Sequence, residues 1–169
     1  GLGDVYKRQV YCGNGRGKTT LAIGQALRAS SQGKSVIIIQ FLKGNERREL
    51  DFLEELDQLD IKIFRFEKME SCYDQLNEEE QAEEERNILN GLNFARKVIA
   101  TQECDFLVLD EILGLLDKHI ATVDMVVGLL KQKDESMHLI LTGNRVDPGI
   151  LDYVDSVTTI TTLGREQNS

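Results

Sequence analysis

The stretch Cys12-Gly13-Asn14-Gly15-Arg16-Gly17-Lys18-Thr19-Thr20 decides the fold, because it joins an apolar, strand-like segment to a helix-like one. Glycines at 13, 15 and 17 permit backbone conformations that other residues avoid, so successive N–H groups can turn inward and form a nest for phosphate oxygens. Lys18 adds a positive charge. A helix beginning near Gly17 would direct the positive end of its dipole at the same anion. The stretch therefore predicts a phosphate-binding loop.

The loop matches the pattern G-x-x-x-x-G-K-[ST] except at its first position, where Cys12 replaces glycine. An ordinary glycine-rich turn with one exposed lysine is the simpler alternative, and the strand-loop-helix context argues against it. A dinucleotide fingerprint fails on two counts. The spacing is G-x-G-x-G, and the next predicted strand ends in Gln40 where a ribose-binding acid is expected. We expect the hydroxyl of Thr19 to ligate a magnesium ion that accompanies the phosphates.

Composition narrows the class of ligand. With 169 residues and 41% hydrophobic content, the chain is long enough for one domain with a sizeable core. Its net charge of -9 argues against nucleic acid or an acidic membrane as a partner, because proteins that bind them present basic surfaces. The first 44 residues nevertheless hold seven basic side chains and one acidic side chain. Positive charge around the predicted loop favours a compact polyanion such as a nucleotide.

The remaining global features concern location and boundaries. Three scattered cysteines predict neither a disulfide framework nor a Cys-x-x-Cys metal site, and they favour a cytoplasmic setting. No apolar run approaches the roughly 20 residues that a membrane span needs. Residues 1–9 include Asp-Val-Tyr-Lys-Arg-Gln, which resembles a translated sequencing adapter. We therefore expect a non-native leader over 1–9 and a single nucleotide-binding domain over 10–169.

Apolar runs and helical periodicities alternate along the chain. Strands are predicted over 35–41, 61–66, 106–109, 137–141 and 154–160, with helices from 17 to about 30, over 45–59, from 77 towards 101 and around 123–130. This alternation predicts an α/β fold: a mostly parallel sheet with helices on both faces and ligands at the carboxyl ends of the strands.

The longest predicted helix has a clear start signal, since Asn77 and Glu80 have the spacing of a capping box. Its expected inner face comprises Ile88, Leu89, Leu92, Phe94, Val98 and Ile99. The acidic run over 78–86 is expected to face solvent, where it would also complement the helix dipole. A metal cluster is the alternative interpretation of those glutamates.

A second chemical element follows the apolar run over 106–109, which ends in Asp110 and Glu111. Carboxylates at the end of a central strand would supply hard oxygen ligands for magnesium opposite Thr19. Alone, such a pair is often a solvated turn or a helix cap, but the phosphate-binding loop favours the functional interpretation. His119 and His138 stand apart from other ligand-type residues in sequence, so structural roles are expected for both. Cys12 is expected to serve packing or loop geometry.

Taken together, these motifs resemble the corrinoid adenosyltransferases of the P-loop type. The likeness is carried by Val10 to Thr20, Gln40-Phe41-Leu42-Lys43-Gly44, Val108 to Glu111, and Leu141-Thr142-Gly143 followed by Arg145. The Gln-Phe-Leu-Lys-Gly stretch discriminates best, because the other motifs recur among many P-loop NTPases. The resemblance implies a P-loop NTPase-like, RecA-like fold. It also implies transfer of the 5'-deoxyadenosyl group of ATP to a cobalt(I) corrinoid, with release of triphosphate.

The resemblance also implies roles for particular residues. The triphosphate would be held by Gly13, Asn14, Gly15, Arg16, Gly17, Lys18, Thr19 and Thr20. Lys18 and Glu111 would carry the catalytic roles, and Mg²⁺ would be bound by Thr19 and Glu111 with support from Asp110. Lys43 and Arg145 would face the nucleotide or the corrin. However, Asn144 precedes Arg145 where the family usually has arginine directly after Thr-Gly.

The expected partners are ATP and a reduced corrinoid, while a flavoprotein reductant and a homodimer are left open. Neither nucleic acid nor a membrane is expected as a partner. Two other functions are compatible with the residues. One is a P-loop ATPase in which Glu111 orients water, and the other is a non-catalytic module gated by nucleotide.

Overall fold

The computed structural model describes residues 7–14, 17–42, 53, 55, 58–66 and 73–164. Gly15, Arg16, Lys43 and most of the helix predicted over 45–59 lie outside the described residues. The described elements are β1 (Arg8–Cys12), α1 (Lys18–Ser31), β2 (Val36–Gln40), β3 (Ile61–Arg65), the 3₁₀ turn η3 (Tyr73–Gln75), α3 (Glu78–Thr101), β4 (Phe106–Asp110), α4 (Gly114–Asp117), α5 (Val123–Gln132), β5 (His138–Thr142), α6 (Pro148–Leu151) and β6 (Ser156–Thr159).

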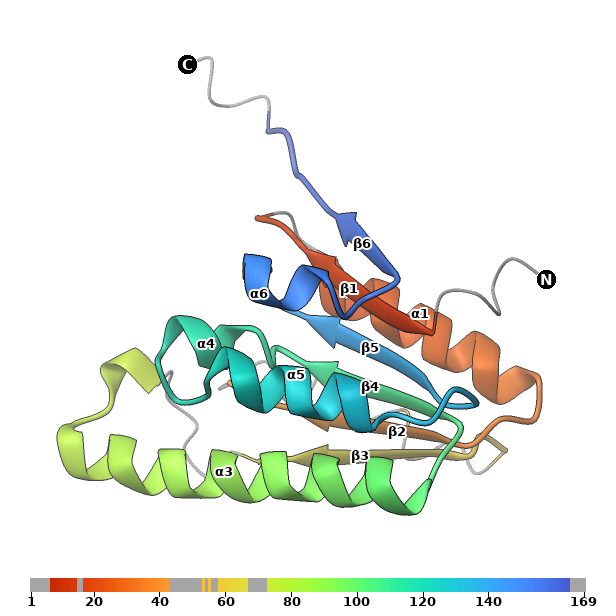
Figure 1. Cartoon of the computed structure of the whole chain (residues 1–169), viewed down its shortest axis with the longest axis horizontal. Helices are drawn as coiled ribbons and strands as arrows, with labels where there is room; N and C mark the ends of the chain where they lie inside the picture. Colours follow the sequence, from red (N-terminus) through yellow and green to blue (C-terminus); the bar gives the residue numbers. More distant parts are fainter. Residues whose placement is uncertain are drawn as a thin grey trace.

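Within these ranges, six strands form one sheet in the order β3-β2-β4-β5-β1-β6 (Figure 1). Every neighbouring pair is parallel, so the carboxyl ends of all the strands lie at the same edge. β5 lies between β1 and β4, which keeps the strand before the loop apart from the strand that ends in Asp110. The predicted parallel α/β sheet is confirmed.

The two faces of the sheet build two separate hydrophobic cores, because successive strand residues point to opposite sides. Val10, Ile39 and Leu109 belong to the core that α3 and α5 cover. Tyr11, Ile38 and Val108 belong to the core beneath α1. Figure 1 shows α3 and α5 on one side of the sheet and α1 on the other. Helices on both faces are therefore confirmed.

Helix α1 follows the predicted loop directly. Small alanines dominate its buried face, which comprises Ala22, Ile23, Ala26 and Ala29. Small side chains let the helix backbone approach the strands closely, so the start of α1 is held firmly over the sheet. The helix ends at Ser31, and Gly33 follows with a positive φ of 85°.

Helix α3 begins as predicted. The side chain of Asn77 accepts from the N–H of Glu80 at 2.8 Å, and the N–H of Asn77 donates to the Glu80 carboxylate at 3.1 Å. Further along, Gly91 sits so close to the sheet side that an added Cβ would lie 2.6 Å from the ring of Phe66 and 2.8 Å from that of Phe41. The absence of a side chain at Gly91 therefore sets how near α3 lies to β2 and β3.

Two details of the α3 prediction are wrong. Leu89, placed on the inner face, is 38% exposed, whereas Glu84, placed in the solvent-facing run, is only 3% exposed. The reason is helical geometry: position 84 is one turn before the buried Ile88 and shares its face, while position 89 is rotated about 100° away from it. The acidic run is therefore not uniformly solvated.

The strands agree with the predicted runs to within about two residues at each end. β1 includes Arg8 and Gln9, which the sequence analysis assigned to a leader, and Gln9 pairs with Ile140 of β5 and Ser156 of β6. Leu53 and Leu59, from the segment predicted as a helix over 45–59, both pack in the core beneath α1. None of the helices in the described ranges has the length and apolar character needed to cross a bilayer.

Candidate active site

The loop after β1 turns sharply at Gly13, whose φ is 114°. A Cβ at this position would lie 2.3 Å from the carbonyl oxygen of Ile160, so a side chain is excluded both by conformation and by space. The N–H of Gly13 donates to the carbonyl of Asn144 at 2.8 Å. The first turn of the loop is thereby fastened to the loop after β5. The amide of Gly13 therefore already has an acceptor within the protein.

Lys18 is the first residue of α1, and its side chain lies back over the loop. Its ammonium donates to the carbonyl of Gly13 at 2.8 Å and to the Oδ1 of Asn144 at 3.1 Å. These two acceptors are neutral, and an ammonium binds anionic phosphate oxygens more strongly. The lysine is therefore held at the loop, next to the start of α1, where a helix dipole also favours an anion.

Asp110 is fully buried, with 0% of its surface exposed. Three neutral side chains donate to its carboxylate. Thr19 lies 2.9 Å from Oδ1, Thr142 lies 2.8 Å from Oδ1, and the amide of Gln40 lies 3.1 Å from Oδ2. These residues come from α1, β5, β2 and β4, so one carboxylate joins four elements at the carboxyl edge. Thr19 and Asp110, predicted to act together, are in direct contact.

Glu111 takes a different direction from Asp110. Its backbone has a positive φ of 64°, which is uncommon for a residue with a side chain, and its N–H donates to the hydroxyl of Thr142 at 2.8 Å. The carboxylate of Glu111 reaches the start of α4, where Oε2 lies 3.0 Å from the position that a Cβ on Gly114 would occupy. The two adjacent acids therefore have separate environments, and Asp110 is the one that accepts the Thr19 hydroxyl.

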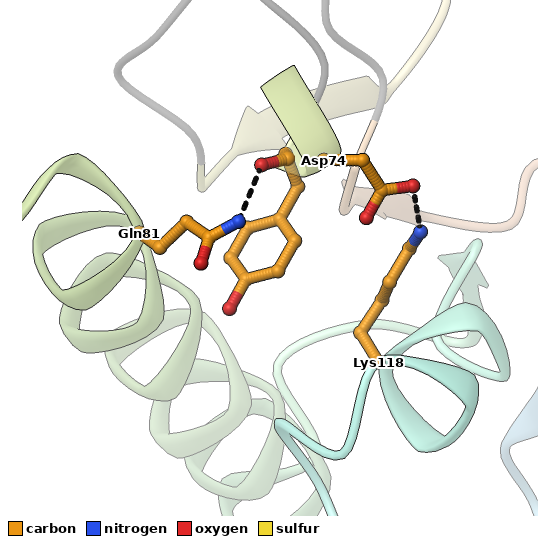
Figure 2. A network of polar contacts seen from close by, with 4 residues as sticks. Asp74, Gln81 and Lys118 are labelled. Carbon is orange, nitrogen blue, oxygen red and sulfur yellow. Dashed lines mark hydrogen bonds and ion pairs between the residues drawn. The ribbon is translucent and has the colours of Figure 1, made fainter. Parts of the chain in front are cut away.

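Short helix α4, which follows Glu111, is fastened at its far end by a polar network (Figure 2). Lys118, just after α4, pairs with Asp74 of η3. The amide of Gln81 in α3 donates to the carbonyl of Tyr73 at 3.0 Å. Burial and the hydrogen bond to Glu85 raise the pKa of Tyr73 to about 12, so this phenol stays protonated at neutral pH. The network ties η3 between α3 and the segment that carries Glu111.

Arg145 lies beyond the Lys18 contact, on the far side of Asn144. Its guanidinium donates to the carboxylate of Asp117 at 2.9 Å. The pair borders a hollow of about 310 Å³ whose apolar lining includes Leu113, Leu116 and Val123. Asn144, which the sequence analysis treated only as an interruption before Arg145, is therefore the residue of this loop that contacts Lys18.

Of the three residues expected to be structural, His138 and Cys12 have packing contacts, whereas His119 is exposed and borders the hollow beside Arg145. The ring of His138 stacks on that of Phe106 at 4.6 Å between centroids, at the amino edge of the sheet. Burial, followed by nearby lysines, lowers the pKa of His138 to about 4. Cys12 is buried with its Sγ 3.7 Å from the Thr159 hydroxyl. Among the described residues, no group of three or more His, Cys, Asp or Glu side chains could hold a metal ion.

Sequence reasoning missed three members of this site: Gln40, Thr142 and Asn144. The first two are polar residues that end apolar strands, which is a recognisable signal at the carboxyl edge of a parallel sheet.

The Thr19 hydroxyl and the Asp110 carboxylate lie 2.9 Å apart, and both offer hard oxygen atoms as ligands. They fit a magnesium ion that completes its shell with phosphate oxygens and water.

Comparisons with known proteins point in one direction. A family model described as ATP:corrinoid adenosyltransferase BtuR/CobO/CobP matches residues 7–167. The corrinoid adenosyltransferase of Escherichia coli K12 is 30% identical over 154 residues, covering 88% of this chain and 73% of that one. The corrinoid adenosyltransferase CobA of Salmonella typhimurium is 28% identical over 152 residues, covering 88% of this chain and 73% of that one.

Among solved structures, a KaiC-like protein of Pyrococcus horikoshii OT3 superposes with a TM-score of 0.58 at 19% identity. The match covers 95% of this chain and 76% of that one. At that identity the likeness concerns the fold alone, and it agrees with the predicted P-loop NTPase-like architecture.

Proposed function

Because the chain belongs to the ATP:corrinoid adenosyltransferase family, which transfers the adenosyl group of ATP to a corrinoid, we propose that its phosphate-binding loop holds the triphosphate of ATP. The observation that carries this assignment is the Lys18 ammonium held over the loop at 2.8 Å from the Gly13 carbonyl. The loop residues are those of the sequence prediction: Gly13, Asn14, Gly15, Arg16, Gly17, Lys18, Thr19 and Thr20. Lys18 and the N-terminus of α1 offset the charge of the leaving group.

The reaction requires little acid-base catalysis from the protein. A cobalt(I) corrinoid carries its own electron pair, so it attacks C5' of ATP without a deprotonated side chain. The Co–C5' bond forms as the C5'–O bond breaks, and the electron pair of the broken bond leaves on triphosphate. The protein must hold C5' in line with cobalt and stabilise the negative charge that develops on the departing oxygen. Lys18 meets the second requirement.

Thr19, Asp110 and Glu111 are the residues that we propose to hold Mg²⁺. The support for the first two is the hydrogen bond of 2.9 Å between the Thr19 hydroxyl and the fully buried Asp110 carboxylate. Bound Mg²⁺ would neutralise part of the triphosphate charge. Thr142 and Gln40 hold the Asp110 carboxylate in one orientation. We include Glu111 because it directly follows Asp110 and its carboxylate lies at the start of α4.

We propose two partners, a reductant and a second copy of the chain. We propose that a flavoprotein supplies the reducing electron, because the cobalt(I) state must be generated before each transfer. We also propose a homodimer, which size-exclusion chromatography with light scattering would detect. A monomeric mass across the working concentration range would exclude the dimer without affecting the assignment of the loop.

The test of the function is product analysis. Protein, MgATP and chemically reduced cobalamin are mixed under anaerobic conditions, and the visible spectrum is followed for the alkylated corrinoid. We expect triphosphate and an adenosylated corrinoid only when both reductant and corrinoid are present. Production of ADP and phosphate without a corrinoid would instead support the hydrolytic reaction in which Glu111 orients water. Binding of ATP without any turnover would support a nucleotide-gated module.

A further inference from the structure

We propose that Gln40 is a positioning residue of the metal-phosphate site: its amide orients the Asp110 carboxylate while its carbonyl oxygen accepts from a water of the metal shell. This inference rests on the proposed function. Gln40 is the last residue of β2, in which all five residues are buried. The parallel register sets Gln40 opposite Asp110, so the backbone itself brings the two side chains together at the carboxyl edge.

The direction of the Gln40 amide follows from hydrogen-bond chemistry. Nε2 lies 3.1 Å from Asp110 Oδ2, and the ionised carboxylate expected at a metal site only accepts hydrogen bonds, so the NH₂ group must face it. The Oε1 atom is itself an acceptor, so it cannot form a hydrogen bond with that carboxylate. It is buried, and no hydrogen-bond donor for it exists among the residues that the structure describes. Buried carbonyl oxygens are normally paired, so this acceptor calls for a donor beyond those described residues.

Water in the shell of a metal is a suitable donor. Mg²⁺ usually keeps several waters when it is bound through one or two carboxylates and substrate phosphates, and those waters donate strongly. Asp110 already contacts Thr19, so an ion at this pair lies in the neighbourhood of the residue that Gln40 touches. A donor there satisfies the oxygen that the described residues leave unpaired.

The amide also limits the charge of the site. A glutamate at position 40 would put a second carboxylate beside Asp110, where like charges repel in a poorly solvated environment. Glutamine has the same shape, contributes a donor and adds no charge. Thr19, Thr142 and Gln40, which donate to Asp110, are all neutral and add no charge to the site.

The experiment measures ATP affinity by calorimetry, once with Mg²⁺ and once with EDTA, for the wild type and for Gln40→Met. Methionine resembles glutamine in length and lacks both the donor and the acceptor. We expect affinity with Mg²⁺ to fall by about 10-fold to 100-fold, the usual effect of removing an outer partner of a metal ligand, and affinity in EDTA to stay unchanged. In steady-state adenosylation, kcat should fall while KM for the corrinoid stays constant.

Gln81→Leu is the matched control, because Gln81 also donates one hydrogen bond from a half-buried amide, to the Tyr73 carbonyl at 3.0 Å, away from Asp110. It should alter neither affinity. Gln40→Leu is a second variant in case the methionine variant does not fold, and thermal melting reports folding for each protein. If neither position-40 variant folds, Gln40 serves stability alone and the proposal is overturned.

The outcomes distinguish a failure of the proposed function from a failure of the Gln40 role alone. Lys18→Ala should lose ATP affinity both with Mg²⁺ and with EDTA. If the wild type binds no ATP, or Lys18→Ala binds it normally, the proposed function fails and the Gln40 inference fails with it. If Lys18→Ala behaves as expected but Gln40→Met matches the wild type, or loses affinity equally in both conditions, the role of Gln40 alone is refuted.

Discussion

The carboxyl edge and the amino edge of the sheet give buried ionisable groups opposite environments. At the carboxyl edge, three donors surround the buried carboxylate of Asp110. At the amino edge, burial followed by neighbouring basic groups lowers the pKa of Lys133 to about 8 and that of His138 to about 4. The carboxyl edge thus supplies hydrogen-bond donors to a buried acid, whereas the amino edge favours the neutral forms of two bases.

The difference favours the carboxyl edge for the metal-bound phosphate that we propose. Parallel strands bring their carboxyl ends together, so that Thr19 of α1 contacts Asp110 and Lys18 of α1 contacts Asn144 in the loop after β5. The amino edge carries the ends of helices and a stacked pair of rings, Phe106 and His138. For the proposed metal-bound phosphate, the carboxyl edge would supply a cation, hydroxyls and a carboxylate. Variants at each edge test this difference.

The largest effect is expected from Lys18→Ala at the carboxyl edge. Removing the ammonium that lies over the loop should lower adenosyl transfer on the order of 10²-fold or more, because transition-state charge loses its main partner. The rate of appearance of the alkylated corrinoid spectrum measures the change. Lys131→Ala, which removes an exposed cation over the Tyr153 ring, is the control and should keep the wild-type rate. Unchanged turnover in Lys18→Ala would remove the loop from the mechanism.

Asp110→Asn should give the next largest effect. The replacement has the same shape but turns one accepting oxygen into a donor that faces hydroxyl and amide donors, and it removes the charge available to Mg²⁺. We expect ATP affinity in the presence of Mg²⁺ to fall about 10-fold to 100-fold. Titration calorimetry with and without the metal measures it. Asp124→Asn, an exposed residue in the first turn of α5, should bind like the wild type; equal behaviour of both variants would contradict a special role for Asp110.

A pH titration addresses the amino edge. His138 has a folded-state pKa of about 4 against an ordinary value of 6.5, so between these values the unfolded chain binds more protons than the folded one. The free energy of unfolding should therefore fall as the pH decreases from about 6.5 to about 4, with no further loss from this group below that range. Urea unfolding at several pH values measures this change.

His138→Gln removes the titrating group and should show a smaller loss over the same pH range than the wild type. Identical slopes in the two proteins would mean that the folded histidine does not resist protonation. The charged groups that act on it, besides burial, are Lys7, Lys34, Lys133 and Asp155.

The smallest effect is expected midway between the edges, in α1. A Cβ at Gly24 would meet nothing within 4 Å, so Gly24→Ala should gain helix propensity without a clash. We expect the free energy of unfolding to rise by about 0.5–1 kcal/mol, with ATP affinity unchanged. Chemical denaturation and calorimetry on the same preparation measure both. A lower stability would contradict the expected gain in helix propensity. A weaker affinity would show that a change in α1 reaches the loop, and that the two edges are coupled.

Much of the fold could be predicted because its signals are local. The Asn77–Glu80 capping box involves residues three apart, and the apolar runs over 106–109 and 137–141 identify β4 and β5 directly. Side-chain burial within a helix was harder to predict. Leu89 and Glu84 were assigned to the wrong environments because an acidic or apolar composition was weighed above the angular position around α3.

The site was only partly predictable, for a different reason. Lys18, Thr19 and Asp110 were named from motifs, whereas the contacts that hold them depend on which strands are neighbours. Gln40 meets Asp110 because β2 pairs with β4, and Asn144 meets Lys18 because β5 pairs with β1. Strand order is a property of the whole chain, so no local pattern announces these partners.

The close approach of Gly91 to Phe41 gives α3 an influence on chemistry that it never touches. Phe41 directly follows Gln40, and its ring lies where a methyl group on Gly91 would have to go. A bulkier residue at position 91 of α3 would displace the Phe41 ring and the end of β2. The Gln40 amide would then shift relative to the Asp110 carboxylate. Variants that impair catalysis should therefore arise on the outer layer of the molecule as well as in the loop itself.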